Sequence, residues 1–155
     1  MDYRVDTNVL LRALANPNPH KLAARNAIKT LLHRGADLRV APQNLIEFWG
    51  VCTRPAQHNG LGKSIAIMDR YCRFAESFLT MLPEGPGIFT AWRSLVVHYG
   101  ILGKQVHDAR IVATMTTNRV PRLLTFDTAD FARYIEIQVI NAQTVDRMKQ
   151  RDEFD

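Results

Sequence analysis

The chain has 155 residues, of which 46% are hydrophobic, and this is enough for one well-packed core but too little for two ordinary domains. A charged share of 23% and the lack of any apolar run of about 18 residues argue against a disordered chain and a membrane-spanning helix. Charges interrupt the N-terminal residues, which disfavours a signal peptide, so we expect a single soluble cytoplasmic domain over residues 1–155. The formal net charge of +5 at pH 7 favours polyanionic partners.

Short apolar runs alternate with longer segments of helical periodicity along the chain. Asp6, Thr7 and Asn8 suit a strand-to-helix turn. Pro42 suits the first turn of a helix, and the glycine-containing segment 54–62 predicts an exposed loop. The expected elements are, in order, a strand at 3–5 and a helix from 9; a helix at 20–34, a strand at 38–41 and a helix at 42–53; a helix at 63–79 and a strand at 80–83; helices at 88–99 and 105–117; a strand at 122–126, a helix at 129–134 and a strand at 136–140.

Strands alternating with helices at this density predict an α/β domain with a mostly parallel sheet and helices on both faces. In such sheets, functional groups collect beyond the carboxyl ends of the strands. Two acids occupy that place here, because Asp6 follows the first strand and Asp127 follows the strand at 122–126.

A third acid, Asp108, lies on the core-facing side of its helix. It forms an i, i+3, i+4, i+7 stripe with Ile111, Val112 and Met115. Burying an unpaired carboxylate costs several kcal/mol, so Asp108 must be neutralised, hydrogen-bonded, paired with a cation or bound to metal. The alternative is that Asp108 merely caps its helix.

The other acids have simpler interpretations as well. Asp6 could serve only as a helix N-cap, and Asp127 could likewise only begin the Asp-Thr-Ala-Asp turn. Asp130, three residues later, is a competitor for the functional role of Asp127. Glu47 lies opposite the apolar stripe of its helix, so periodicity alone predicts a solvated surface acid. If these carboxylates converge, they repel each other, and a divalent cation removes that cost. Oxygen ligands suit Mg²⁺ or Mn²⁺, and such a site in a basic protein suits phosphodiester hydrolysis.

Four stretches of the chain resemble the PIN domain, and specifically the VapC-type toxins of toxin–antitoxin pairs. They occur in the order found in that family and span nearly the whole chain. They are VDTNVL at 5–10, NLIEF at 44–48, VHDARIVA at 106–113 and LTFDTADF at 124–131.

The resemblance implies a PIN-like three-layer α/β/α fold with a central sheet of four to five strands. It implies an endoribonuclease, a hydrolase that uses Mg²⁺ or Mn²⁺ and leaves a 5′-phosphate on RNA. The acids that it makes catalytic and metal-binding are Asp6, Glu47, Asp108 and Asp127, with Asn8 and Thr125 positioning them. It also implies an antitoxin that covers the apolar surface of the early helices, and we further expect a homodimer with no membrane association.

Two other functions are open to this sequence. One is an Asp-nucleophile phosphotransferase, but such enzymes generally need a second acid two residues on, where Asn8 stands. The other is a catalytically silent domain that binds RNA or protein. Finally, three arginines flank the Asp108 helix and the strand before Asp127, and they either follow the RNA backbone or form surface ion pairs. They are Arg110, Arg119 and Arg122.

Overall fold

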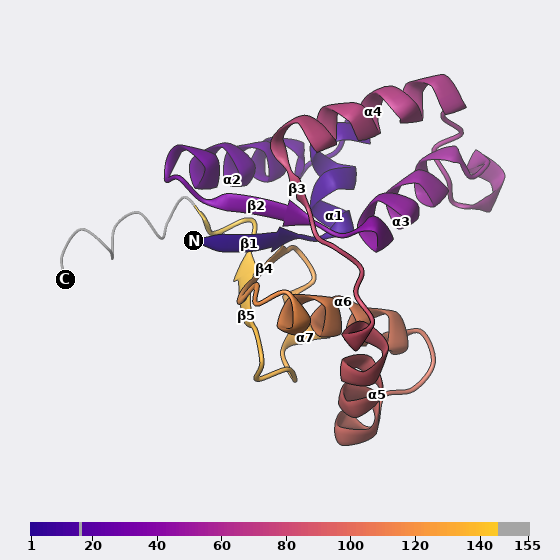
Figure 1. The fold of residues 1–155 in the computed structure, drawn as a ribbon. Helices are drawn as coiled ribbons and strands as arrows, with labels where there is room; N and C mark the ends of the chain where they lie inside the picture. Colours follow the sequence, from indigo (N-terminus) through magenta and orange to yellow (C-terminus); the bar gives the residue numbers. More distant parts are fainter. Residues whose placement is uncertain (16, 146–155) are drawn as a thin grey trace.

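A computed structural model describes residues 1–15 and 17–145. Residue 16 and the C-terminal part of the expected domain, residues 146–155, lie outside the described residues. A five-stranded sheet with the order β3-β2-β1-β4-β5 forms its centre, and every pairing is parallel (Figure 1). The predicted α/β class is therefore confirmed, with a sheet that is wholly parallel. The strands are β1 (Asp2–Val5), β2 (Asp37–Val40), β3 (Thr80–Met81), β4 (Arg122–Thr125) and β5 (Gln138–Asn141).

The helices agree with the predicted order. They are α1 (Thr7–Leu10), which continues into the π-helical turn η1 (Leu11–Ala15), α2 (Lys21–His33), α3 (Pro42–Thr53), the 3₁₀ turn η2 (Ala56–His58), α4 (Ile65–Phe78), α5 (Gly87–Tyr99), α6 (Gln105–Thr117) and α7 (Thr128–Phe131). The segment 54–62, predicted as an exposed loop, contains η2 and bonds back to α3, because the Leu61 amide donates to the Val51 carbonyl. Within the described residues, no helix is both long and apolar enough to cross a bilayer.

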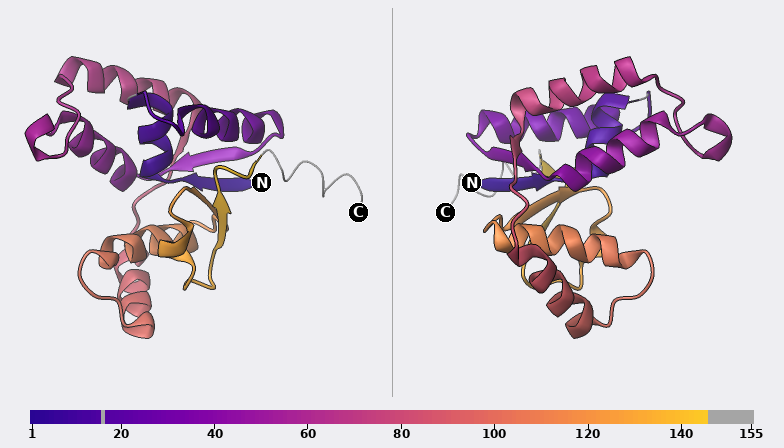
Figure 2. Two further views of the ribbon diagram at one scale, coloured as in Figure 1. Left: turned by 180° about the vertical axis from the view of Figure 1, so that it is seen from behind. Right: turned by 45° about the vertical axis from the view of Figure 1, so that its right-hand side comes forward.

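The helices form one layer on each face of the sheet. Helices α1 to α4 cover one face and α5 to α7 cover the other, and this separation is clear from both directions in Figure 2. Alternation along the strands supplies both cores, because Leu124 packs in the cluster of the first face and Leu123 in that of the second. On β1, Val5 faces the first cluster, whereas Arg4 points the other way and bonds to the Ile111 carbonyl of α6.

The strand order places a switch point between β1 and β4. From β1 the chain builds outwards through β2 and β3, and it later returns to the other side of β1 to add β4 and β5. Val5 pairs in register with Leu124, and the Asp6 amide donates to the Leu124 carbonyl at 3.0 Å. The carboxyl ends of β1 and β4 therefore adjoin, which is where parallel sheets of this kind bind ligands.

Candidate active site

Asp6 ends β1 and begins α1. One carboxylate oxygen, Oδ1, accepts a hydrogen bond from the Thr7 amide at 2.8 Å, so the side chain does cap the helix. The other oxygen, Oδ2, accepts from the Thr125 hydroxyl at 2.8 Å, and Asn8 Nδ2 lies 3.3 Å from it. Burial raises the pKa of Asp6, while the bonds from Thr125 and Thr7 and the charge of Arg4 act in the opposite direction. Capping thus accounts for only one of its two oxygens.

Asn8 and Thr125 connect the ends of β1 and β4. Asn8 Nδ2 donates to Thr125 Oγ1 and to Asp127 Oδ2, both at 3.0 Å, and Asn8 Oδ1 accepts from the Phe126 amide at 3.2 Å. The Asp127 amide in turn donates to Thr125 Oγ1 at 3.0 Å. This network holds Asp127 beside Asp6.

Glu47 reaches the same place from α3. Thr7 Oγ1 donates to Glu47 Oε2 at 3.0 Å, and Gln43 Nε2 donates to Glu47 Oε1 at 2.9 Å. Because the Thr7 amide also contacts Asp6, a single residue links the two acids. The interpretation of Glu47 as a solvated surface acid, which followed from periodicity, is wrong because the half-buried side chain is held from two sides.

A buried arginine lies beneath these acids, and the sequence analysis did not select it. Arg4 is fully buried, donating from Nε to Asn44 Oδ1 at 3.0 Å and from Nη1 to the Ile111 carbonyl at 2.9 Å. Asn44 links Arg4 to Thr7, because Asn44 Nδ2 donates to Thr7 Oγ1 at 3.2 Å. Burial lowers the pKa of Arg4 to about 10, against the effect of the Asp6 and Glu47 charges. Its Nη2 is buried without a hydrogen-bond partner among the described residues.

Asp108 faces this group from α6 with no hydrogen bond or ion pair to any described residue. Its stripe partners Ile111 and Met115 are buried, so the core-facing orientation is confirmed. It does not cap the helix, because Lys104 occupies the N-cap position. Burial, followed by the charges of four acids, raises its pKa to about 6. Those acids, in order of decreasing effect, are Asp130, Asp6, Glu47 and Asp127.

The two candidates at the C-terminal end have different surroundings. Both are exposed, but Asp127 accepts a hydrogen bond from Asn8, whereas Asp130 is the carboxylate that acts most strongly on Asp108. Both acids therefore border the site. The sequence analysis considered Asp130 only as an alternative to Asp127. The three-residue spacing of the two acids on a short helix could have indicated that both lie on one side of it.

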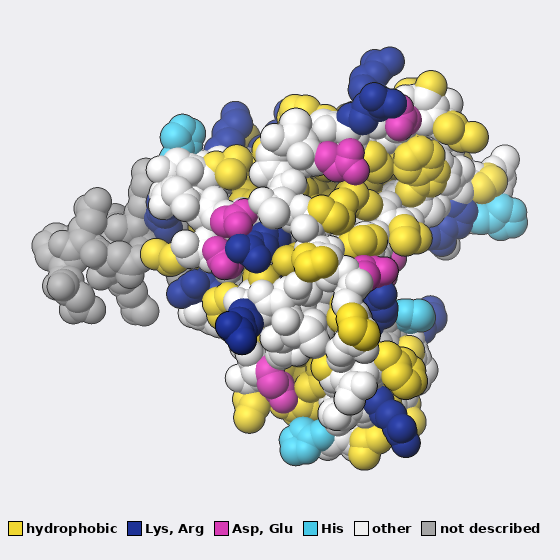
Figure 3. Space-filling view, viewed as in Figure 1, with side chains coloured by type: hydrophobic (Ala, Val, Ile, Leu, Met, Phe, Trp, Pro, Cys, Tyr) yellow, Lys and Arg dark blue, Asp and Glu magenta, His cyan; other side chains and the backbone are white. Residues whose placement is uncertain are grey.

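The three arginines predicted to follow RNA or to form surface ion pairs have different surroundings, and Arg110 does form an ion pair. Arg110 lies near the acids, where Nη2 binds Glu84 at 2.6 Å and Nη1 binds Gln43 Oε1 at 2.9 Å. Arg122 instead begins β4, at the opposite edge of the sheet from Asp127, with its guanidinium over the Tyr3 ring. At the junction between the two helical layers, Figure 3 shows acidic side chains beside a basic one and a histidine. A pocket of about 480 Å³ opens there, and its lining includes Glu47, Glu84, His107 and Arg110.

The donor set suits a hard divalent cation. Within residues 1–15 and 17–145, no three His, Cys, Asp or Glu side chains are close enough to enclose a metal ion by themselves. Magnesium is usually held by one or two carboxylates together with water and phosphate oxygens, and the open arrangement leaves room for these. The carboxylate of Asp108, which has no partner among the described residues and faces other carboxylates, fits such a ligand set.

Comparisons with known proteins identify the family model and the fold. The PIN domain model matches residues 3–137. No curated protein matches the sequence. Among solved structures, VapBC2 from Rickettsia felis, bound to a DNA fragment from its promoter, matches with a TM-score of 0.68 at 19% identity, over 91% of this chain and 98% of that chain.

Two further structures agree. VapBC-1 from nontypeable Haemophilus influenzae matches with a TM-score of 0.62 at 16% identity, over 92% of this chain and 98% of that chain. PAE2754 from Pyrobaculum aerophilum matches with a TM-score of 0.61 at 19% identity, over 97% of this chain and all of that chain. At these identities the likeness concerns the fold.

Proposed function

Because the chain belongs to the PIN-domain family, we propose that it is a divalent-metal-dependent endoribonuclease and the toxin of a toxin–antitoxin pair. The observation that carries this proposal is the state of Asp108. A half-buried carboxylate with no hydrogen bond, whose pKa is raised to about 6 by burial and four other acids, has no stabilising partner in the described chain. A bound cation supplies one.

Each residue then has a defined part. Asp6, Glu47, Asp108 and Asp127 would hold the ion, while Asn8, Thr125 and Thr7 orient three of these carboxylates. A bound Mg²⁺ or Mn²⁺ lowers the pKa of a water molecule and stabilises charge on the attacked phosphate. The net charge of +5 draws RNA to a site that is itself acidic. No protein nucleophile is needed.

The partner follows from the relatives and from one surface. Another solved structure of this fold, VapBC-5 from Mycobacterium tuberculosis, is a member of the VapBC family of toxin–antitoxin systems, which supports an antitoxin here. On the layer away from α5 and α6, a groove of about 510 Å³ is lined by Leu14, Ile28, Leu32, Phe74 and Phe78. This groove lies on the early helices that we expect the antitoxin to cover, and co-purification with the product of the small gene adjoining its own tests the pairing.

The activity is tested by incubating the purified chain with single-stranded RNA and Mn²⁺ or Mg²⁺, and then with excess EDTA. We expect cleavage with metal, none with EDTA, and 5′-phosphate ends. A matched substrate with 2′-deoxy sugars at the cleaved linkage separates this chemistry from contaminating nucleases. Water attack still cuts that substrate, whereas attack by the 2′-hydroxyl cannot. Cleavage that persists in EDTA, or stops on the 2′-deoxy substrate, would refute the mechanism.

The silent-domain alternative gives a different result. Such a domain would bind RNA or protein but cleave no RNA at any metal concentration.

A further inference from the structure

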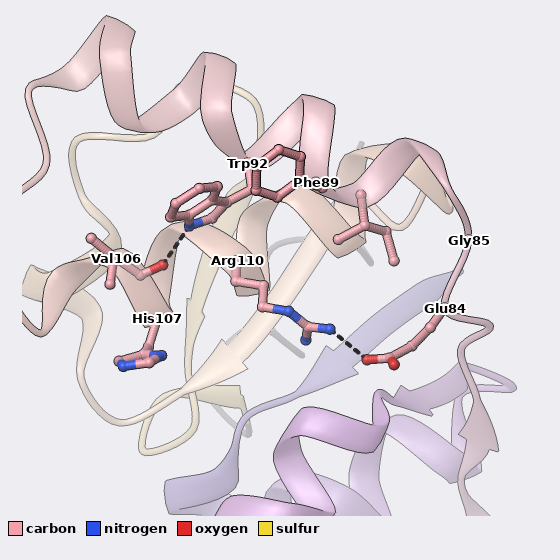
Figure 4. Close-up of a pocket in the computed structure, with 8 residues that line it drawn as sticks. Glu84, Gly85, Phe89, Trp92, Val106, His107 and Arg110 are labelled. Atoms are coloured by element: carbon pink, nitrogen blue, oxygen red, sulfur yellow. Dashed lines mark hydrogen bonds and ion pairs between the residues drawn. The ribbon is translucent and has the colours of Figure 1, made fainter.

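A third hollow lies between α5 and α6, next to the acidic site. Its volume is about 510 Å³. Phe89 and Trp92 come from α5, Val106, His107 and Arg110 come from α6, and Glu84 comes from the segment that leads into α5. Figure 4 shows the two rings together, with Arg110 and His107 across from them.

The two aromatic residues form a platform that the described chain leaves open. Phe89 is 66% exposed, and its ring centroid lies 5.5 Å from that of Trp92 with a tilt of 31°. Trp92 Nε1 donates to the Val106 carbonyl at 2.8 Å, which fixes the indole (Figure 4). An exposed ring beside a fixed ring is costly to keep in water and suited to stacking on a flat partner.

The polar side of the hollow is already neutralised. Arg110 is held by Glu84 at 2.6 Å and by Gln43 at 2.9 Å, so its charge is not free to bind a phosphate. The ion pair nevertheless presents donors and acceptors at a fixed place. A neutral planar group with a polar edge fits this combination better than an anion does.

This hollow is continuous with the acidic site. Glu84, His107 and Arg110 line both the aromatic hollow and the pocket that contains Glu47. Gln43 bridges the two, because it donates to Glu47 while it accepts from Arg110. A chain whose phosphate lies at the acids can therefore place its next group between the rings and Arg110.

We propose that this hollow is a subsite for one unstacked base of a single-stranded RNA, held against Phe89 and Trp92 with its edge toward the Arg110–Glu84 pair. The inference rests on the proposed function in taking RNA as the substrate. Every base has a stackable face, so the subsite supplies affinity and position for any sequence. An apolar side chain of a partner protein is the competing occupant.

The test measures RNA binding without cleavage, in EDTA at low salt. The chain has two tryptophans, so Trp49→Phe leaves Trp92 as the only indole reporter. We expect a short single-stranded RNA to quench Trp92 fluorescence, and Phe89→Ala to weaken binding about fivefold or more. A second series of RNAs carries one abasic nucleotide, placed in turn at each position. With the wild-type protein, binding should weaken when the abasic nucleotide stands at one particular position. With Phe89→Ala, the abasic nucleotide at that position should not weaken binding further.

The matched control is Phe74→Ala, which removes a ring of 56% exposure on α4 and should leave RNA affinity unchanged. Equal losses in the two variants, unchanged affinity in Phe89→Ala, unquenched Trp92 or no RNA binding at all would each overturn the subsite.

Metal-dependent cleavage is measured separately on the same proteins. If the chain cleaves RNA and Phe89→Ala binds normally, the subsite fails and the nuclease stands. If binding shows the abasic signature and no RNA is cleaved, the nuclease fails and the subsite stands.

Discussion

Asp6 and Asp108 are two acids of one site with opposite surroundings. Burial raises the pKa of both. For Asp6, the hydrogen bonds from Thr125 and Thr7 and the charge of Arg4 oppose this rise in pKa. For Asp108, the charges of the neighbouring acids raise the pKa further. The chain therefore supplies partners for the charge of Asp6, although burial still leaves its pKa raised. Among the described residues it supplies no such partner to Asp108, and in the proposed function a cation takes that place.

The difference has a geometric cause. Asp6 ends a strand whose neighbour ends beside it, so backbone amides and short polar side chains from both strands reach its oxygens. Asp108 is the fourth residue of α6, beyond the position from which a side chain caps a helix. No backbone donor is available there.

The largest effect we expect is on cleavage. Asp6→Asn and Asp108→Asn should each reduce metal-dependent RNA cleavage at least about a hundredfold, because each removes a metal-binding charge. In EDTA the two should differ in melting temperature. Asp108→Asn should raise it by removing repulsion, while Asp6→Asn should lower it because the new amide meets the Asn8 donor.

The control is Asp69→Asn, an exposed acid paired with Arg73 on α4, which should change neither quantity. Two variants that shift the melting temperature in the same direction would contradict the contrast between the acids.

Removing the buried cation should weaken the Asp6 side. Arg4→Met preserves length but removes the buried donors to Asn44 and to the Ile111 carbonyl and leaves Asp6 without its counter-charge, so we expect a loss of about 2–4 kcal/mol in the free energy of unfolding. Urea denaturation measures it. Arg39→Met is the comparison, because Arg39 pairs with Asp2 and Asp37 at the surface and should cost at most about 1 kcal/mol. Equal costs would mean that burial of Arg4 contributes nothing specific.

Thr125→Val should leave Asp6 with one hydrogen-bond donor fewer, and so closer to the unpartnered state of Asp108. It keeps the shape of a fully buried side chain but removes the hydroxyl that serves Asp6, Asn8 and Asp127. We expect a loss of about 1–3 kcal/mol in stability and about tenfold in Mg²⁺ affinity, measured from the Mg²⁺ dependence of the melting temperature. Thr114→Val, also buried but bonded only within α6, should leave Mg²⁺ affinity unchanged. A normal affinity in Thr125→Val would remove that hydroxyl from the site.

The smallest effect concerns pH. The pKa of Asp108 rises from 3.8 to about 6 in the folded chain, so the folded state binds its proton more tightly than the unfolded state. Stability from this group is fully present below about pH 4 and is lost as pH rises through about 6, by about 1 kcal/mol once screening by water is included.

Thermal melts in EDTA from pH 4 to pH 7 test this expectation. The wild type should lose more stability over that interval than Asp108→Asn. Parallel curves for the two proteins would contradict it, and excess Mg²⁺ should remove the difference because bound carboxylates stay ionised.

The sequence anticipated the fold closely. The helices expected at 42–53 and 105–117 have the observed bounds, and the strands fall within a few residues of their predicted places. Local signals sufficed because Pro42 fixes a helix start and apolar spacing marks the buried face. The rule that sites follow strand ends also selected Asp6 and Asp127. These inferences need only neighbouring residues and the general geometry of parallel sheets.

Contacts between residues far apart in the chain could not be predicted from the sequence. Periodicity assigned Glu47 to the surface, because its donor Thr7 lies 40 residues away, and it passed over Arg4, whose partner Ile111 lies 107 residues away. It also grouped Arg110 with Arg122, although Arg110 lies on α6 and binds Glu84, whereas Arg122 begins β4 and lies over the Tyr3 ring.

By itself, therefore, the sequence determined the alternation of strands and helices, the parallel sheet and the acids at two strand ends. Only the tertiary structure decided which side chains share those acids, because the strand order β3-β2-β1-β4-β5 brings β1 against β4 across more than a hundred residues. Hydrogen bonds act over about 3 Å and depend on that juxtaposition, whereas apolar periodicity records only which face of an element is buried.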